Sequence, residues 1–453
     1  MDSNINLKNK KVLLVGLGIL GGGVATARFL VERGAELTVT DMKDSEYLKT
    51  SIDKLADLNI KYVVGGHKEE DFLNNEIIVV NPGVPVDDPL IQLARDHGKQ
   101  IENELTLFYK FCKSKNIVAV TGTRGKTTTV NWAHHFLKQK DPRAVLCGNS
   151  PENPFLASLE FIKEDTLVVL ETPSFQLELV NESVPAPSVA VITNIYQDHL
   201  NRHKTIENYA SIKANIFRGQ HENDFLILNK NNDWTEYFLN QNPKSKVVLA
   251  EVSNVGLDDA EIEDFRNKWG EHNVINLSLA VNAVRPLGVT IAQIRKSLLD
   301  LPQIKFRQEL ILKNGDLEIY NDSAATSPEA GIVAINRYKN VPGKFILIAG
   351  GTDRELDFRE WGAVVSRELS PENLILLSGS ATEKMKYELR SMNYDLGKVA
   401  EFESLRECLV EALARSQGKT SIVFSPASKS FEKFKNEFDR GEQFNSTVAV
   451  FAI

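Results

Sequence analysis

A glycine-rich stretch near residue 120 constrains the fold of this chain more than any other feature. The apolar run at 117–120 is too short for a helix and predicts a buried strand, and a helical pattern begins near Val130. Between them lies Gly122-Thr-Arg-Gly-Lys-Thr127. Glycines in that position let backbone N–H groups surround an anion, while the helix N-terminus points at the same charge. The order of strand, glycine loop and helix therefore predicts an α/β domain with a phosphate-binding loop.

The residue types in this loop indicate a nucleotide rather than a plain turn. Lys126 is expected to reach the β- and γ-phosphates, and the Thr127 hydroxyl to ligate Mg²⁺. The general form of the loop has a glycine five places before Gly125, where this chain has Val120, so the loop is a short variant. A glycine turn that only joins the strand to the helix is the alternative interpretation, and the Lys-Thr pair argues against it.

A second glycine motif lies near the start of the chain. A predicted strand at 11–15 leads into Gly16, Gly18 and Gly21, and a second strand at 35–40 is followed by Asp41. This pattern is typical of dinucleotide-binding units, in which the helix N-terminus holds a diphosphate and the acidic residue holds a hydroxyl or a base. The motif alone is a weak indication of NAD, because a turn that allows tight packing has the same glycines.

Strand and helix patterns alternate through the rest of the chain and predict three α/β domains. The first is a Rossmann-like domain at 1–113, the second a central P-loop ATP-binding domain at 114–303, and the third a Rossmann-like domain at 304–453. Residues 244–268 are expected to be irregular. Further strands are expected at 61–64, 76–84, 166–170, 188–192, 318–322, 344–349, 373–377 and 421–425.

Composition restricts the classes of function. The chain has 453 residues and a formal net charge of −8, which argues against a nucleic-acid scaffold held by phosphate contacts. Its three cysteines have no metal-ligand spacing and cannot make a disulfide framework. No apolar run approaches the roughly 18 residues of a membrane span, and the N-terminus lacks the apolar core of a signal peptide. We therefore expect a cytoplasmic protein with no nucleic-acid or membrane partner.

Further motifs, taken in order with the phosphate loop, narrow the function. Glu171 follows a predicted strand and begins Glu-Thr-Pro-Ser-Phe-Gln, and Lys213 ends Tyr-Ala-Ser-Ile-Lys. In this order the motifs resemble the Mur ligases of peptidoglycan synthesis, over nearly the whole chain. The segments that carry the resemblance are 16–18, 81–84, 122–128, 171–178, 193–194, 198–200, His203, 209–213, 272–276, 321–323, 349–351 and 425–427.

The resemblance implies an ATP-dependent ligase that forms an amide through an acyl phosphate. It is strongest to the members that add D-glutamate to UDP-N-acetylmuramoyl-L-alanine, and we expect a monomer. Lys126, Lys213 and His199 are the implied catalytic residues. Two Mg²⁺ ions are implied, with Lys213 carrying a carbamate, which converts a cation into an oxygen donor. The implied metal ligands are Thr127, Glu171, His199 and Lys213.

The resemblance also implies three binding sites, one for each substrate. The ATP site would comprise Gly122, Thr123, Arg124, Gly125, Lys126, Thr127, Thr128, Asn273, Arg307 and Asp322. The site for the UDP substrate would comprise Gly16, Gly18, Leu20, Asp41, Asn149, Ser174 and Gln176. The amino-acid site would comprise Thr326, Arg354, Ser430 and Phe438.

The chain departs from the family pattern at three positions. Ala324 lies in Asn-Asp-Ser-Ala-Ala-Thr, where the family has a lysine, and Arg354 replaces a second lysine. Because arginine can hold a carboxylate through two parallel bonds, the second change keeps the charge and alters the geometry. Leu20 stands where the family has a small hydroxyl residue.

Three alternative functions remain open. A related ligase could take another amino acid such as L-glutamate, or a folylpolyglutamate-type substrate, although the first glycine motif argues against the folate enzyme. An NAD-dependent oxidoreductase would account for Gly16, Gly18 and Asp41 but leaves the Gly-Lys-Thr loop unexplained. A nucleotide-binding protein without catalytic activity is the third alternative, suggested by Ala324.

Overall fold

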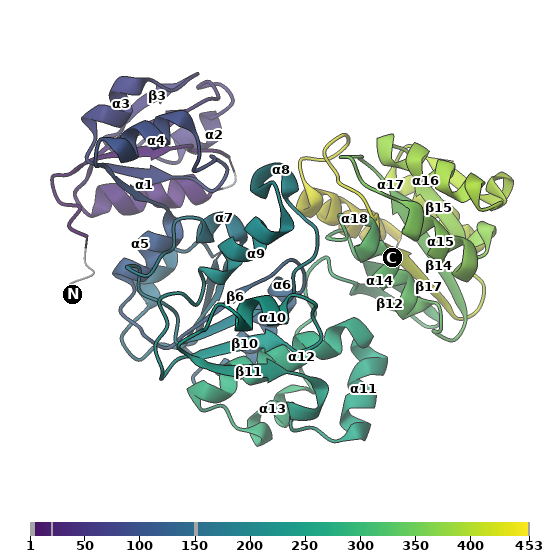
Figure 1. Ribbon diagram of the computed structural model, residues 1–453. Helices are drawn as coiled ribbons and strands as arrows, with labels where there is room; N and C mark the ends of the chain where they lie inside the picture. Colours follow the sequence, from purple (N-terminus) through teal and green to yellow (C-terminus); the bar gives the residue numbers. More distant parts are fainter. Residues whose placement is uncertain (1–4, 20, 149–152, 452–453) are drawn as a thin grey trace. The chain divides into compact units, whose positions relative to one another are not determined.

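Three β-sheets flanked by helices make up the described part of the chain, which in this computed structural model comprises residues 5–19, 21–148 and 153–451 (Figure 1). Parallel neighbours prevail in every sheet, and the third sheet also contains an antiparallel hairpin. Parallel strands must be joined by crossovers, so helices cover the faces of each sheet. Among the described residues, no helix is both long enough and apolar enough to cross a membrane.

The first sheet is built around β1 (Lys11–Val15), with strand order β3-β2-β1-β4-β5. Val12 and Leu14 face one hydrophobic core while Leu13 and Val15 face another, as expected for a strand covered on both sides. Because the strand order reverses beside β1, ligands of such sheets bind outside the carboxyl end of that strand. The other elements are α1 (Gly22–Glu32), β2 (Glu36–Asp41), α2 (Lys49–Asp53), β3 (Lys61–Val64), α3 (Glu69–Asn74), β4 (Ile77–Val80), α4 (Pro89–Asp96), β5 (Gln100–Glu102) and α5 (Glu104–Phe111).

The second sheet has the order β11-β10-β9-β6-β8-β7, and all five residues of β6 (Ile117–Thr121) are buried. The chain passes from β8 on one side of β6 to β9 on the other, so the loop after β6 lies at a crossover point of the sheet. The other elements are α6 (Lys126–Lys138), β7 (Val145–Gly148), β8 (Val168–Glu171), α7 (Ser174–Leu177), β9 (Val189–Ile192), α8 (Leu200–His203), α9 (Ile206–Ala214), β10 (Phe225–Asn229), α10 (Thr235–Leu239), β11 (Lys246–Ala250), α11 (Asp259–Trp269), α12 (Glu271–Val284) and α13 (Ile291–Ser297).

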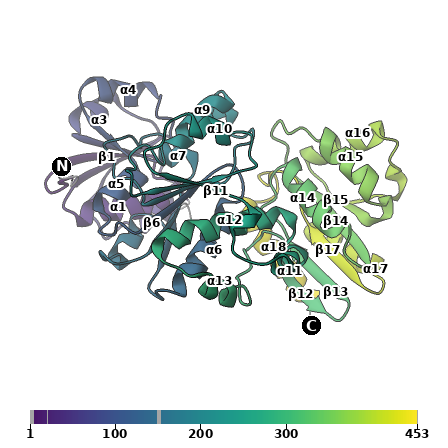
Figure 2. The same ribbon diagram turned by 60° about the horizontal axis from the view of Figure 1, so that its bottom comes forward.

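The third sheet has the order β12-β13-β17-β14-β15-β16. Helices α14, α15 and α16 pack on one face and α17 and α18 on the other (Figure 2), and alternate residues of β14 enter the two cores. The elements are β12 (Glu309–Asn314), β13 (Leu317–Asn321), α14 (Pro328–Tyr338), β14 (Lys344–Gly350), α15 (Arg359–Glu368), β15 (Leu374–Leu377), α16 (Ser380–Ser391), β16 (Ala400–Phe402), α17 (Leu405–Arg415), β17 (Thr420–Phe424) and α18 (Glu437–Phe451).

The predicted α/β class and the three sheet-based domains are confirmed, and one local prediction is wrong. Residues 244–268 are not irregular, because β11 and most of α11 lie there. β11 is the edge strand of its sheet and its first two residues are exposed, although its apolar run at 247–250 is as long as that of β1. In α11 only Ile262, Phe265 and Trp269 are buried, on one face of an otherwise charged helix.

Two compact units divide the described chain. The first contains the first two sheets and ends near Leu301, and the second comprises residues 302–453 together with 270–272.

Candidate functional site

The loop between β6 and α6 accepts only glycine at two positions. A Cβ on Gly122 would lie 1.9 Å from Thr193 Oγ1, and a Cβ on Gly125 would lie 2.3 Å from Asn276 Oδ1. Both glycines also have positive φ, 143° and 81° respectively, which side chains disfavour. The loop backbone is therefore enclosed by its neighbours in a conformation that presents N–H groups at the N-terminus of α6.

Two residues after β9 hold this loop in place. The Thr193 hydroxyl donates to Arg124 O at 2.6 Å, and the Asn194 side chain accepts from Arg124 N at 2.9 Å. The sequence pointed to residues 193–194 only as part of a motif. Their role as anchors depends on β9 lying beside β6, which only the sheet order reveals.

The predicted phosphate and metal residues of the loop lie together. Lys126 Nζ donates to Gly122 O and to Thr123 O, both at 2.9 Å, so its ammonium lies over the loop. The Thr127 hydroxyl donates to Glu171 Oε1 at 3.3 Å, because β8 ends beside β6. A hydroxyl and a carboxylate oxygen at this spacing are the hard donors that Mg²⁺ prefers.

Lys213 reaches the same loop from α9. Its side chain is 1% exposed, and Nζ donates to Gly122 O at 2.8 Å and lies 4.4 Å from the centre of the Tyr209 ring. Burial, and then the nearby Lys126 ammonium, lower the pKa of Lys213 well below its ordinary value. Two lysines therefore meet at one carbonyl oxygen, and one of them is poised to be uncharged.

Two histidines on the segment after β9 have different surroundings. His199 keeps 42% of its side chain exposed, lies 3.6 Å from Asp198 and has a left-handed φ of 54°. His203 is buried, with Nε2 3.0 Å from Ser174 Oγ, and burial together with nearby positive groups lowers its pKa to about 4. His199 is thus accessible to a ligand while His203 is packed in the domain.

No cluster of three or more His, Cys, Asp and Glu side chains in the described residues is placed to hold a metal ion. The ligand set expected from the resemblance differs in kind, because it includes the Thr127 hydroxyl and a modified lysine. His199 and Lys213 both lie against the Tyr209 ring, His199 with its ring centre 6.3 Å away. The structure therefore brings these two residues to the same side chain.

The Asp41 side chain accepts hydrogen bonds from the backbone of the glycine loop in the first domain. Its Oδ2 accepts from Leu17 N at 2.8 Å and from Gly18 N at 3.1 Å, and the side chain is 7% exposed. Gly16 N in turn donates to Thr40 O at 2.8 Å. Asp41 thus shapes the loop as well as lying at its edge. Leu20 and Asn149, also expected in this binding site, lie outside the described residues.

Two residues expected to bind the UDP substrate, Ser174 and Gln176, are buried in α7, and Gln176 contacts the first domain. Ser174 bonds His203, as described above, and Gln176 is 0% exposed. Gln176 Nε2 donates to Glu104 Oε2 at 3.0 Å, and the backbone carbonyl oxygen of Gln176 accepts from Asn103 Nδ2 at 2.8 Å. In this conformation Gln176 holds α7 against α5, and Ser174 holds α7 against α8.

Two residues expected to contact ATP meet in the third domain. Asp322 follows β13, is 6% exposed, and accepts from Ser425 Oγ at 2.7 Å and from Gln308 N at 3.1 Å. Burial raises its pKa to about 7, against the opposing effect of its hydrogen bonds and of Arg307 and Arg337. Arg307 is exposed on the segment before β12, and Asn273 lies in α12 of the other unit.

The four residues expected to bind the amino acid lie in loops of the third domain or at their edge. Arg354 lies 4.5 Å from the centre of the Phe431 ring, and Phe438 is 53% exposed near the start of α18. Thr326 N donates to Ala324 O at 3.0 Å. Ser430 is 2% exposed, and its hydroxyl has no hydrogen-bond partner in the described chain.

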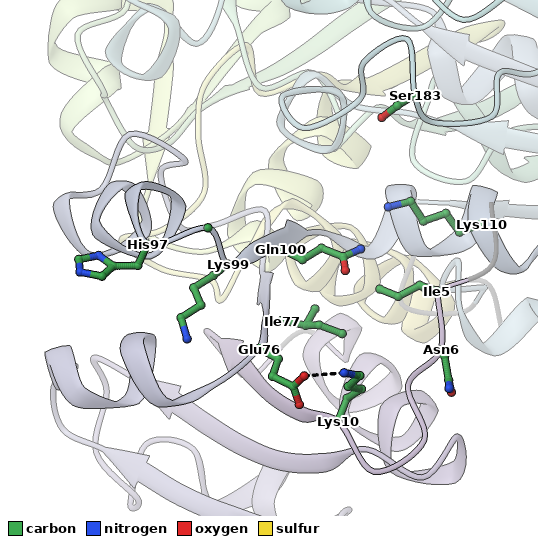
Figure 3. Close-up of a pocket in the computed structure, with 11 residues that line it drawn as sticks. Ile5, Asn6, Lys10, Glu76, Ile77, His97, Lys99, Gln100, Lys110 and Ser183 are labelled. Atoms are coloured by element: carbon green, nitrogen blue, oxygen red, sulfur yellow. Dashed lines mark hydrogen bonds and ion pairs between the residues drawn. The ribbon is translucent and has the colours of Figure 1, made fainter. Parts of the chain in front are cut away.

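A groove also lies beyond the amino ends of β1, β4 and β5 in the first sheet, opposite the carboxyl ends where the glycine loop lies (Figure 3). Lys10 and Glu76 point toward one another there and form an ion pair at 2.6 Å. Since ligands of parallel sheets bind at the carboxyl ends, this groove is not part of the expected site.

Models of protein families match two parts of the chain. A model described as Mur ligase MurD-like, N-terminal domain, matches residues 10–103, and one described as Mur ligase middle domain matches residues 120–284.

Curated proteins are similar over nearly their whole length. A UDP-N-acetylmuramoylalanine–D-glutamate ligase from Roseiflexus sp. (strain RS-1) is 34% identical, over 99% of this chain and 100% of that protein. Proteins of the same name from Borreliella burgdorferi (strain ZS7) and Caldicellulosiruptor bescii are 34% and 33% identical, each over 98% of both chains.

Solved structures share the fold. A UDP-N-acetylmuramate–alanine ligase, MurC, from Thermotoga maritima has a TM-score of 0.59 at 19% identity, covering 98% of this chain and 100% of that one. A MurF ligase from the same organism, in complex with ADP, has a TM-score of 0.58 at 15% identity, covering 98% and 96%. At these identities the likeness concerns the fold alone.

Proposed function

The chain belongs to the Mur ligase family, and from this premise we propose that it joins D-glutamate to UDP-N-acetylmuramoyl-L-alanine with ATP, in peptidoglycan synthesis. The two substrates follow from the names of relatives that match nearly the whole chain. Membership of a family of ATP-dependent amide ligases removes the oxidoreductase alternative. The glycine loop of the first domain is then assigned to UDP rather than to NAD.

The observation that carries this proposal is the convergence of Lys126 and Lys213 on Gly122 O, beside the Thr127–Glu171 pair. A substrate carboxylate and a triphosphate repel one another, so a ligase must concentrate positive charge and hold the two groups in line. Lys126 would hold the phosphate that is transferred to the carboxylate. The acyl phosphate formed in this way would react with the amine of the amino acid, releasing phosphate.

Lys213 suits the proposed carbamate. A carbamate forms when an uncharged amine attacks CO₂ and loses a proton, and burial favours the uncharged amine of Lys213. The carbamate oxygens, Thr127, Glu171 and His199 would then hold two Mg²⁺ ions. When bound, Mg²⁺ would supply positive charge that offsets the charge of the phosphates.

The remaining residues are assigned to the three substrates by domain. Asn273, Arg307 and Asp322 would contact ATP, and the Gly16–Gly18 loop with Asp41 the UDP group. Thr326, Arg354, Ser430 and Phe438 would surround the amino acid. The proposed domain bounds are 1–113, 114–303 and 304–453. Because ATP is the proposed energy source, we place the protein in the cytoplasm. A monomer remains the proposed oligomeric state.

The reaction is tested with a panel of amino acids. The purified protein is incubated with UDP-N-acetylmuramoyl-L-alanine, ATP and Mg²⁺, and phosphate release is measured for D-glutamate, L-glutamate and other amino acids. Release is expected with D-glutamate, and the product should carry one added glutamate by mass spectrometry. Release with another amino acid alone would refute the proposed substrate, and no release at all would refute the ligase.

Lys126→Ala should reduce turnover by at least about 10²-fold, because the transferred phosphate loses its cation. Lys138→Ala, at the exposed end of the same helix, is the matched control and should retain wild-type turnover. Circular dichroism and thermal unfolding check that both variants are folded. Wild-type turnover in Lys126→Ala would show that this loop is not catalytic.

A further inference from the structure

Three loops of the third domain meet at the carboxyl ends of β13, β17 and β14, which are neighbours in the sheet. They comprise residues 322–326, 425–431 and 351–354. The fully buried Arg440 joins the first two, with Nη2 2.7 Å from Ser323 O and Nη1 3.0 Å from Lys429 O. Since one guanidinium reaches both carbonyl oxygens, Lys429 lies close to the segment that contains Ala324.

The position of Lys429 is set by an antiparallel bridge to the third loop. Thr352 N donates to Lys429 O at 2.9 Å, and Lys429 N donates to Thr352 O at 3.1 Å. Directly opposed residues of such a bridge direct their side chains to the same side. The backbone of Lys429 is thus held from both sides, by Arg440 and by Thr352.

Among the described residues, the Lys429 ammonium has no hydrogen-bond or ion-pair partner, unlike Lys384, Lys433 and Arg440 nearby. The Lys429 side chain is nevertheless half-buried. Lys384 is paired with Asp353 at 2.6 Å, Lys433 with Glu403 at 2.5 Å, and the Arg440 guanidinium bonds four oxygen atoms. An unpaired ammonium on a fixed backbone is a ready partner for an anion.

The next residue supplies a second, independent observation. Ser430 is 2% exposed and its hydroxyl is buried without a hydrogen-bond partner in the described chain. Buried hydroxyls are almost always bonded, so this one is a candidate to meet an incoming polar group. Ala324, by contrast, offers neither charge nor a polar side chain to the same loops.

We propose that Lys429 binds a carboxylate of the incoming amino acid, and so supplies the positive charge that Ala324 cannot. This rests on the proposed function, because it assumes a dicarboxylic amino acid as substrate. With Arg354 on the third loop, the pocket would contain two cations for two carboxylates. Lys429 then determines the preference for glutamate over its amide.

The test compares variants that keep the length of the side chain. Lys429→Met should raise the KM for D-glutamate by about 10- to 100-fold, the usual effect of losing a hydrogen bond to a charged group, and leave the KM values for ATP and the UDP substrate unchanged. It should also reduce the preference for D-glutamate over D-glutamine. The control Lys435→Met removes an exposed lysine of the same segment and should behave as wild type.

A second variant keeps the test informative. Adding Ala324→Lys to Lys429→Met should restore much of the affinity for D-glutamate, because the charge returns from the adjacent loop. A KM for D-glutamate within twofold of wild type in Lys429→Met would overturn the proposal, as would an equal rise in all three KM values. Failure of Ala324→Lys to restore affinity would refute the claim that Lys429 replaces position 324.

The proposed function and this inference can fail separately. If the wild type releases no phosphate with any amino acid, the ligase assignment fails. Calorimetric titration of D-glutamate, with the UDP substrate and a non-hydrolysable ATP analogue present, then still tests the pocket. Binding to the wild type that weakens in Lys429→Met supports the carboxylate site, and equal binding by both proteins overturns it.

Discussion

Gly125 is constrained twice, by its backbone angle and by its neighbour Asn276. A left-handed backbone costs a residue with a Cβ about 1–2 kcal/mol. The added methyl would also lie 2.3 Å from Asn276 Oδ1, so the loop or α12 must move. We therefore expect Gly125→Ala to lower both the melting temperature and the affinity for ATP.

Gly65→Ala separates these two causes. Gly65 has a φ of 83°, against 81° at Gly125, but no atom lies within 4 Å of its added Cβ. Gly65→Ala should therefore show only the cost of the backbone conformation. In thermal unfolding, the melting temperature of Gly125→Ala should be lower than that of Gly65→Ala. Equal losses in the two variants would mean that the contact with Asn276 relaxes without cost.

Asp322 makes stability depend on pH in a defined direction. Its pKa in the folded protein is about 7, against 3.8 ordinarily. Between these values the folded state keeps a proton that the unfolded chain releases, so stability is lost as pH rises through this range and stays level above it. Asp322→Asn removes the titrating group. Relative to this variant, the wild type should therefore lose stability between about pH 4 and pH 8.

Scanning calorimetry at several pH values measures this difference. It should reach on the order of a few kcal/mol, since one pKa unit corresponds to about 1.4 kcal/mol. Asp316→Asn, on the exposed turn of the β12–β13 hairpin, is the control and should follow the wild type at every pH. A difference between wild type and Asp322→Asn that is the same at every pH would contradict the assignment.

At the scale of elements, the contact of α5 with α7 depends on buried polar groups. Glu104 at the start of α5 accepts from Thr26 Oγ1 of α1 at 2.7 Å and from Gln176 Nε2 of α7 at 3.0 Å. Burial raises the pKa of Glu104, while both hydrogen bonds act to lower it. The network thus links the helix after the first glycine loop to the second domain.

A double-mutant cycle tests this network. Gln176→Ala should cost about 1–3 kcal/mol, because it leaves a buried carboxyl group short of a partner. Once Glu104→Ala is present, the same change should cost much less. Denaturant unfolding measures the four free energies of unfolding. Additive losses in the free energy of unfolding would show that Gln176 and Glu104 act independently. The control is Ser51→Ala, which shares no hydrogen bond with the network, so its loss should simply add to that of Gln176→Ala.

At the scale of the whole molecule, the two compact units have separate hydrophobic cores. One cluster draws on residues from Leu7 to Phe238, and two others draw on residues from Ile319 to Val448. Because these clusters do not share residues, we expect each unit to unfold in its own transition rather than in a single two-state transition. We predict two calorimetric transitions.

Asp322→Asn identifies which transition belongs to residues 302–453. Raising the pH from about 5 to about 8 should change the difference in melting temperature between wild type and Asp322→Asn for one transition only. A single transition, with calorimetric and van't Hoff enthalpies equal, would show that the units unfold together.

The amino-acid sequence by itself determined the features that arise from neighbouring residues. Short apolar runs predicted the core strands, with β1 and β3 at their observed bounds. The glycines and the Lys-Thr pair predicted the phosphate loop, because those residues act on the backbone next to them. Strands β10 and β11 escaped prediction although each contains an apolar run of four residues, because such a short run does not by itself distinguish a strand from a helix segment.

Tertiary structure alone decided which distant side chains meet. No spacing in the chain indicated that Arg440 would join Ser323 to Lys429, or that Gln176 would be buried against Glu104. The amino-acid sequence also could not distinguish the exposed His199 from the packed His203. These outcomes depend on the order of strands in each sheet, which brings together loops far apart in sequence. That packing determines the burial and the charge of each side chain. It also determines which polar groups are left without a protein partner and can bind a substrate.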